Sequence, residues 1–234
     1  GGPASGRVKE FLIPFEDELL PGALAGYNLP VGDGTERNRP SIRKASKLLE
    51  QAGYTVSQGR LLDPSNQEVS FEILLRQGSS ELKAITNIYR ETLKRLGINV
   101  TISIIDSAQY KERTNVYDFD MTYYRRGLSL SPGNEQFLYW GSEGVTKFGS
   151  RNWMGIKSKA VEKMIQRMLT SPDRADYISA VRALDRILMA GRYVIPIWYS
   201  PYSMIAHDSN LKYPVNLPAY GDWINFLPDV WWFE

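Results

Sequence analysis

A strand-helix-strand pattern between residues 69 and 105 constrains the fold of this chain more than any other feature of its sequence. Residues 69–75 and 98–105 are apolar runs typical of strands. Between them, apolar side chains recur every three or four positions until Gly97 ends the pattern. A helix of that length between two strands implies a right-handed crossover and a parallel strand pair. Together with a third strand expected at 119–124, the pattern predicts a small α/β sheet.

Amphipathic helices are predicted on both sides of this unit. Residues 42–52 carry an apolar stripe at helical spacing, and a short helix is expected from Pro132 to Trp140. Two consecutive helices follow at 158–169 and 171–191. Both have apolar faces wide enough to cover a sheet, so we expect helices packed around the strands.

Prolines, a polar connector and a change to aromatic-rich sequence divide the chain into three parts. Residues 1–40 are broken by prolines and end in a polar connector, which predicts an irregular lead-in segment wrapped over the domain. Residues 41–192 form the α/β lobe. Residues 193–234 open with a strand expected at 193–199, which Pro196 marks as an edge or a bend, and continue as irregular, aromatic-rich chain that docks on a surface.

Composition excludes several classes of function. The 28 Lys and Arg residues nearly balance the 26 Asp and Glu residues and are scattered, so no nucleic acid is expected as a partner. The chain has no Cys and one His, which removes thiol nucleophiles, disulfides, Cys-zinc sites, His-His metal clusters and most Ser-His triads. We expect neither a cofactor nor a metal. No apolar run reaches the roughly 20 residues of a membrane span, and the start carries neither Met nor a signal peptide. We therefore expect a processed or excised piece.

Carboxylate pairs offer a possible route to catalysis. Asp118 and Asp120 lie two positions apart at a strand start and could share a face for acid/base work. A turn Asp followed by an edge-strand Asp explains the same spacing, and we favour it. His207 stands beside Asp208 without a nucleophile motif. No catalytic residue is therefore assigned, and the chain is not expected to be an enzyme.

The loop after the third strand is the first place to look for a ligand, because ligands of open α/β sheets bind outside the carboxyl ends of the strands. It begins with two tyrosines and two arginines, whose guanidinium groups could hold a carboxylate. Alternation along the strand should send Tyr123 and Arg125 to one side and Tyr124 and Arg126 to the other, so that one arginine reaches the solute. The helix expected at Pro132 would present free N–H groups to an anion.

A second loop closes with an arginine, an amide and an indole at 151–153. The alternative for both loops is that the aromatic rings are core, the arginines a solvated edge and the amide a turn residue. The candidate ligand-binding residues are Tyr123, Tyr124, Arg125, Arg126, Ser129, Asn134, Glu135, Arg151, Asn152 and Trp153.

Several motifs occur together in an order that resembles a known family. They are Ala-Gly-Tyr54, Leu-Gly-Ile98, Tyr117-Asp-Phe-Asp-Met121, Asn152, Ser-Pro-Asp-Arg174 and Ile195-Pro-Ile-Trp198. Their order is similar to that of family 5 bacterial extracellular solute-binding proteins, the peptide-binding subunits of ABC importers. Within that family, Ser129–Gln136, Trp140–Ser142, Gly149–Asn152 and the final Trp231-Trp232 resemble the YejA-like branch, associated with oligopeptides and microcin C uptake.

The resemblance implies a fold and a set of partners. The fold would be a type II periplasmic-binding-protein-like lobe, with a small mixed sheet flanked by helices. Members of the family have two lobes, so this chain would be the second, with 193–234 returning toward a missing N-terminal lobe. The partners would be a small peptide or peptide-like solute and the transmembrane subunits of an ABC permease, in the periplasm or at the extracellular face of the cell envelope.

One departure and two alternatives accompany this interpretation. Where the branch has small residues and Trp after the third strand, this chain has Tyr123-Tyr-Arg-Arg126, which leaves the ligand type open. The alternatives are a carboxylate-dependent hydrolase and a protein-interaction lobe that uses the aromatic C-terminal tail.

Overall fold

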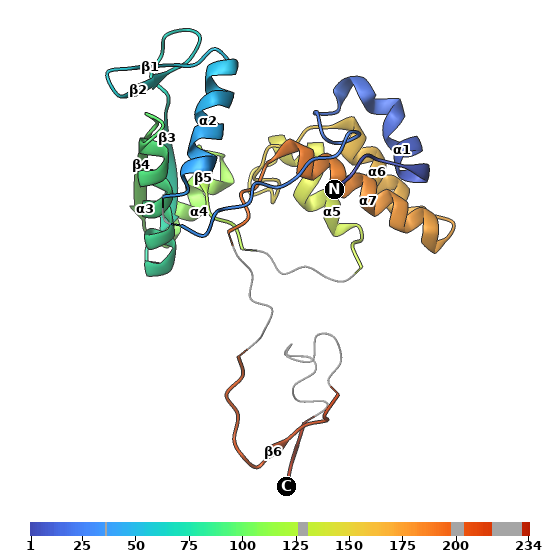
Figure 1. Ribbon diagram of the computed structural model, residues 1–234. Coiled ribbons are helices and arrows are strands. Elements are labelled where there is room, and N and C mark those ends of the chain that lie inside the picture. The colour runs from blue at the N-terminus through green and yellow to red at the C-terminus, as the bar shows by residue number, and fades with distance from the viewer. Residues whose placement is uncertain (36, 126–130, 198–203, 217–230) are drawn as a thin grey trace. The chain divides into compact units, whose positions relative to one another are not determined.

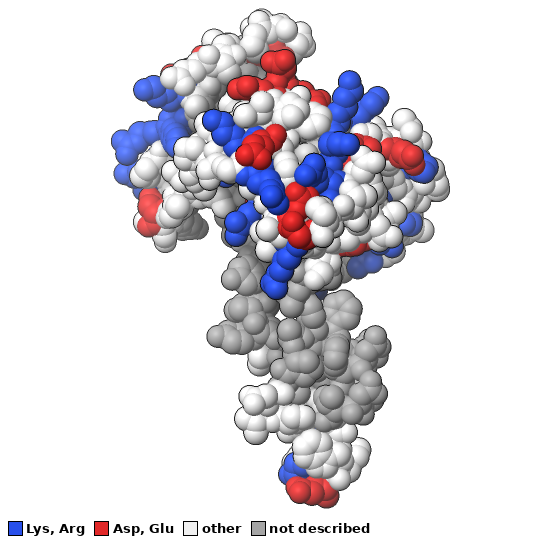
Figure 2. Space-filling model, turned by 90° about the vertical axis from the view of Figure 1, so that its right-hand side faces the viewer, with Lys and Arg blue, Asp and Glu red and all other residues white. Residues whose placement is uncertain are grey.

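The computed structural model describes residues 1–35, 37–125, 131–197, 204–216 and 231–234. The chain forms two units, Gly1–Tyr193 and Val194–Glu234. Among the described residues, no helix combines the length and apolar character needed to cross a membrane. On the face seen in Figure 2, Lys and Arg are mixed with Asp and Glu over much of the surface.

A three-stranded parallel sheet stands in the first unit, with β3 (Ser70–Arg76) between β4 (Asn99–Ile105) and β5 (Met121–Thr122) (Figure 1). Helix α3 (Ser80–Lys94) connects β3 to β4, as the sequence predicts, and packs Tyr89 and Leu93 against the sheet core. That core is small. Its buried members are Ile73, Leu75 and Val100.

Local chemistry explains the ends of these elements. The Asp106 carboxylate accepts hydrogen bonds from the N–H groups of Ala108 and Gln109, at 2.8 and 3.0 Å, and so caps α4 (Ser107–Asn115). Gly97 has a φ of +84°, and a Cβ there would lie 2.7 Å from the backbone nitrogen of Leu61. Only glycine fits this position.

Helix α2 (Arg39–Gln51) and an antiparallel hairpin, β1 (Thr55–Ser57) with β2 (Arg60–Leu62), precede the sheet. The sequence predicts both elements. Helix α2 nevertheless buries none of its residues completely. The fold class is confirmed as α/β, with parallel pairing in the sheet and antiparallel pairing in the hairpin.

A separate helical core corrects two expectations. Residues 1–40 are not wholly irregular, because α1 (Gly6–Leu12) and a 3-10 helix, η1 (Ile13–Glu18), form there. Helices α6 (Lys159–Leu169) and α7 (Arg174–Gly191) pack on each other, and α7 packs on α1, whereas we expected both helices to cover the sheet. Apolar side chains of the N-terminal segment, with Leu12 fully buried, complete this core. The other buried members are Ala4, Ile156, Ala160, Val161, Met164, Ile165, Met168, Ala180, Ala183, Leu184 and Ile187.

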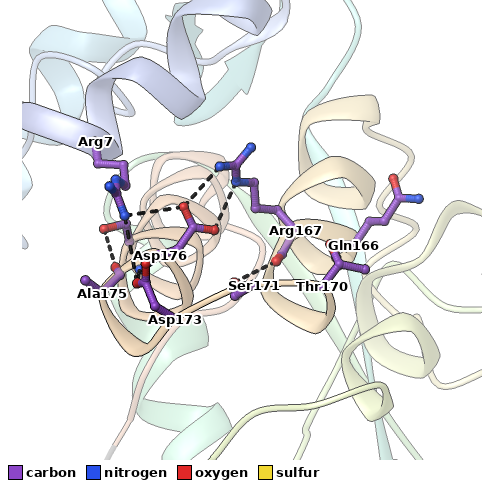
Figure 3. A network of polar contacts seen from close by, with 9 residues as sticks. Arg7, Gln166, Arg167, Thr170, Ser171, Asp173, Ala175 and Asp176 are labelled. Atoms are coloured by element: carbon purple, nitrogen blue, oxygen red, sulfur yellow. Dashed lines mark hydrogen bonds and ion pairs between the residues drawn. The ribbon is translucent and has the colours of Figure 1, made fainter.

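A buried carboxylate joins the three helices of this core (Figure 3). Asp176 in α7 is only 2% exposed and accepts hydrogen bonds from Arg167 in α6, from Nη2 at 3.0 Å and from Nε at 3.2 Å. Arg7 in α1 lies 3.5 Å from the same carboxylate. The bonds from Arg167, and more weakly the charge of Arg7, hold the pKa of Asp176 below its usual value.

The described part of the C-terminal unit, residues 194–197, 204–216 and 231–234, contains little regular structure. Residues 193–197 form no strand, so the strand expected at 193–199 is wrong in its described part; Pro196 lacks an N–H, and no described strand pairs with this segment. Two short strands, β6 (Leu211–Lys212) and β7 (Trp232–Phe233), pair antiparallel. The rings of Tyr213 and Trp231 stack at 4.6 Å. Trp223 and Phe226, two further aromatic residues of the C-terminal tail, lie outside the described residues.

Candidate functional site

An aromatic cluster forms where β5 ends. We define it as Tyr110, Phe119, Tyr123, Tyr124 and Trp153. The ring centroids of Tyr110 and Tyr123 lie 5.7 Å apart in a stacked pair, and those of Tyr124 and Trp153 lie 5.3 Å apart in a T-shaped pair. Trp153 also meets Tyr110 at 6.4 Å and Phe119 at 6.2 Å. The cluster therefore brings a loop residue, Trp153, next to the residues that follow β5, while its predicted ligand contact stays a prediction.

The residues of the aromatic cluster differ in how much of each is exposed to solvent. Tyr110 is buried, and its hydroxyl lies 2.8 Å from Oγ1 of Thr122, which itself donates to the carbonyl oxygen of Leu74 at 2.8 Å. Burial raises the pKa of Tyr110. Tyr123 packs against the sheet core, whereas Tyr124 is 38% exposed. Tyr124 is thus partly exposed to solvent and packs on Trp153, which in turn contacts the buried Tyr110.

Tyr117 ties the loop that carries Trp153 to the sheet. Its hydroxyl lies 2.7 Å from the carbonyl oxygen of Asn152 and 2.9 Å from that of Gly144. Tyr117 itself has a φ of +60°, a left-handed conformation that costs free energy in a non-glycine residue. Sequence reasoning gave Tyr117 no role in the site, because no local pattern marks a hydroxyl whose partner lies 35 residues later.

Asn152 is completely buried, and its side-chain amide is occupied within the loop. Nδ2 donates to the carbonyl oxygens of Gly141 and Ile156, at 3.0 and 2.8 Å, and Oδ1 accepts from the N–H of Ile156 at 3.0 Å. These bonds fix the loop on both sides of Trp153. The predicted ligand contact of Asn152 is untested; its visible role is to position the loop.

Two of the three arginine candidates, Arg125 and Arg151, lie within the described residues and are exposed. Arg125 follows Tyr124 directly and, among the residues that the structure describes, makes no hydrogen bond or ion pair. Because β5 ends at Thr122, strand alternation does not extend to Arg125. Arg151 donates to the Tyr139 hydroxyl at 3.3 Å, and its guanidinium group lies 5.9 Å from the centre of that ring. Arg126 and Ser129 lie outside the described residues.

The helix expected from Pro132 begins later. Helix α5 spans Glu135–Trp140, and the carboxylate of Glu135 accepts the N–H of Gly133 at 3.0 Å. The expectation of a helix start at Pro132 with N–H groups free for an anion is therefore wrong, because the chain supplies its own carboxylate there. Asn134 is exposed beside it.

Asp118 and Asp120, the carboxylate pair considered for acid/base work, each bind another group of the chain. Asp118 lies 2.7 Å from Nε of Arg113, and Asp120 accepts the N–H of Glu72 at 2.8 Å. Arg113 also donates to Glu72 from both terminal nitrogens, at 2.6 and 3.2 Å, and these bonds hold the pKa of Glu72 below its usual value. The three carboxylates thus join α4 to β3 and to the start of β5.

Two further observations concern catalysis and metals. Nδ1 of His207 lies 2.8 Å from the carbonyl oxygen of Asp208, and its ring meets Tyr213 and Trp231 edge-on. Within the described ranges, no three His, Asp or Glu residues lie together in a way that could hold a metal ion.

Comparison with known families decides the class of the chain. The family described as bacterial extracellular solute-binding proteins, family 5 Middle, matches residues 16–148. The chain belongs to this family. A putative binding protein of Brucella melitensis is 39% identical over 99% of this chain, and the probable peptide-binding protein YejA of Agrobacterium fabrum is 37% identical over the same share. The resemblance to the YejA-like branch is thereby confirmed.

Both relatives are longer than this chain. It spans 37% of the length of both relatives. In the solved structures, the oligopeptide-binding protein AppA of Bacillus subtilis, in complex with a nonapeptide, matches 80% of this chain and 38% of its own length, with a TM-score of 0.59 and 20% identity. The match confirms a fold of the periplasmic-binding-protein type.

Proposed function

We propose that this chain is one lobe of the solute-binding component of an ABC importer that captures peptides or peptide-like compounds. The family membership of the chain carries the proposal. The name of the YejA relative and the nonapeptide of AppA support peptides as the solute class. Binding proteins of this kind need no chemistry of their own, so we propose capture and release without catalysis.

The proposed ligand surface is built on the Tyr124–Trp153 pair. Its rings offer flat apolar faces that can pack against side chains of a peptide. Arg125 stands next to this pair, and Arg151 is two residues from Trp153 in sequence. A guanidinium group can donate two parallel hydrogen bonds to a ligand carboxylate. We also propose contacts from Arg126, Ser129, Asn134 and Glu135, with Tyr123 and Asn152 as supports.

The division into a lead-in segment (1–40), a ligand-binding lobe (41–192) and a returning segment (193–234) belongs to the same proposal. The returning segment exposes many apolar side chains. They include Val194, Ile195, Ile197, Met204, Val215, Trp232 and Phe233, with Met204 at 95% and Val215 at 98% exposure. Such a surface is typical of an interface. We propose that it packs on the other lobe of the complete protein.

Closure of the two lobes around the solute would capture it. A peptide that contacts both lobes stabilises the closed state over the open one, and only the difference in its contacts between the two states can drive closure. The closed protein would then deliver the solute to the transmembrane subunits in the periplasm, or at the outer face of the envelope.

Mass spectrometry of small molecules that co-purify with the complete, two-lobed protein tests the proposal. We expect a peptide or peptide-like compound that binds saturably and is recovered unchanged. Recovery of cleaved products after incubation would instead support the carboxylate-dependent hydrolase. Binding of a protein to the isolated tail, with no small solute found, would support the interaction lobe.

The proposed packing of the tail has its own test. This chain alone should bind a hydrophobic dye or self-associate, because its apolar tail lacks the other lobe. A variant that ends at Tyr193 should bind less dye. Sedimentation of the whole chain as a compact monomer without dye binding would contradict the proposed packing.

A further inference from the structure

Strand β4 lies at the edge of the sheet, because it pairs with β3 and with no other strand of the described chain. The register of the β3–β4 pair continues without a bulge from Ser70 and Asn99 to Arg76 and Ile105. The edge strand is seven residues long. Its free side is therefore a long row of backbone groups that can pair with another strand.

The two ends of the β3–β4 ladder show which residues of β4 face this free side. The N–H of Asn99 donates to the carbonyl oxygen of Val69 at 3.1 Å, and the carbonyl oxygen of Ile105 accepts from the N–H of Gln77 at 2.7 Å. Because the backbone groups of successive strand residues point to alternate sides, the odd-numbered residues of β4 bond to β3 and the even-numbered residues face outward. The outward-facing residues are Val100, Ile102 and Ile104.

Strand β4 lacks the features that usually protect the edge of a sheet. Such edges commonly carry a charged side chain, a proline or a bulge. No charged residue and no proline occurs between Asn99 and Ile105. The side chain of Ile104 is also open to solvent, since this residue is 43% exposed. An edge of this kind favours pairing with another strand.

The sequence of β4 is complementary to itself. If a second copy approaches antiparallel about a twofold axis through Ile102, this residue lies opposite its own counterpart. Val100 then lies opposite Ile104, and Thr101 lies opposite Ser103. Apolar pairs and hydroxyl pairs of this kind are favourable across strands. The same alignment pairs the outward backbone groups of all three even-numbered residues in both copies.

From the open edge and its symmetry we infer that β4 is a docking surface for a second copy of this chain. The two β4 strands pair antiparallel and continue one sheet through both copies, as in other strand additions. A single strand pair buries little surface, so the dimer forms reversibly. The inference does not depend on the proposed solute site, because the aromatic cluster lies at β5, on the other side of β3.

Amide hydrogen exchange, measured residue by residue by NMR at several concentrations of this chain, tests the inference. The amides of Val100, Ile102 and Ile104 should exchange rapidly in dilute solution and about tenfold or more slowly as the dimer forms. Those of Thr101 and Ser103 bond to β3 and should stay protected throughout. Sedimentation over the same concentrations should show a monomer–dimer equilibrium. Self-association through the apolar tail would not produce this alternation along β4.

Ile104→Lys should weaken the dimer by about tenfold or more, because it places a charge beside Val100 of the second copy. Val116→Lys is the matched control, since Val116 is 53% exposed and lies outside the sheet, and it should change dimerisation by about twofold at most. Circular dichroism should show that both variants stay folded.

Three results would overturn the inference. The outward amides could remain unprotected at every concentration, which would show that no strand pairs with them. They could be protected even in dilute solution, which would show that the chain covers its own edge. Equal losses of dimerisation in Ile104→Lys and Val116→Lys would show that β4 is not the contact.

Discussion

The Tyr117 hydroxyl lies 2.7 Å from the carbonyl oxygen of Asn152, and this contact links the start of β5 to the loop that carries Trp153. Met121 of β5 packs on the sheet core, and Ile156, which follows this loop, belongs to the helical core. The position of Trp153 against Tyr124 therefore depends on a bond that involves neither ring.

Tyr117→Phe removes this bond and keeps the ring. We expect a loss of about 1 kcal/mol in the free energy of unfolding, typical of one hydrogen bond. The near-UV circular dichroism of the aromatic cluster should weaken as Trp153 loosens. Urea unfolding and the spectrum measure the two effects. Tyr139→Phe is the control, since its hydroxyl bonds an exposed arginine at 3.3 Å; equal losses in both variants would contradict the role of Tyr117.

Asn152→Ala should destabilise the chain more strongly. It removes the side-chain partner of the carbonyl oxygen and the N–H of Ile156, and one of the two donors to the carbonyl oxygen of Gly141. We expect a loss of roughly 2 to 4 kcal/mol in the free energy of unfolding. Asn134→Ala, at an exposed position, should cost about 0.5 kcal/mol or less. Denaturant titration measures the free energy of unfolding of both variants. A small loss in the Asn152 variant would show that the loop does not need the side-chain amide.

Acid should weaken the helical core through Asp176. Because its pKa is lower in the folded state than the unfolded value of about 3.9, its contribution to stability is complete above that value. The contribution is lost as the pH falls through the folded-state pKa. We therefore expect Asp176→Asn to have a lower Tm than the parent chain at pH 7, with the gap closing below about pH 4.

Arg167→Gln separates this effect from general acid unfolding. Without Arg167, which supplies the main bonds to Asp176, the further change to Asn should show much less dependence on pH. Melting curves of the single and double variants between neutral and acidic pH provide the measurement. A gap that stays constant into strong acid would contradict the assignment.

The sequence predicts those elements that nearby residues determine, and it predicts poorly those that depend on packing against distant parts of the chain. The β3-α3-β4 unit can be predicted from the periodicity of apolar side chains and from Gly97, because both signals are local in the sequence. Helix α1 is only seven residues long, and such a helix owes its stability to packing, here on α7, rather than to its own sequence. Prolines nearby made its segment look irregular.

The site divides in the same way. Tyr123 and Tyr124 could be predicted, because they follow a strand in a sheet whose carboxyl edge is the usual ligand position. The contribution of Tyr117 could not, because it depends on how a distant loop returns to the sheet. The alternation argument did not reach Arg125, because only Met121 and Thr122 pair with β3.

Arg125 provides the sharpest test of the proposed ligand surface. In the complete two-lobed protein, Arg125→Ala should weaken binding of the identified solute by about tenfold to a hundredfold, the worth of a paired guanidinium and carboxylate. Arg125→Lys should recover part of the loss. Arg174→Ala, an exposed arginine on α7, is the control. Calorimetry and melting curves should be run on Arg126→Ala as well; unchanged affinity in both folded variants at 125 and 126 would remove these arginines from the site.

Comparison of solute affinity between this chain and the complete protein tests the central claim most directly. If the chain supplies one lobe of a closing cleft, it offers only part of the contacts and leaves the solute partly hydrated. Calorimetry with the solute identified by co-purification should then give saturable one-to-one binding to the complete protein and binding at least about a hundredfold weaker to this chain. Equal affinities for the two would contradict the two-lobed account.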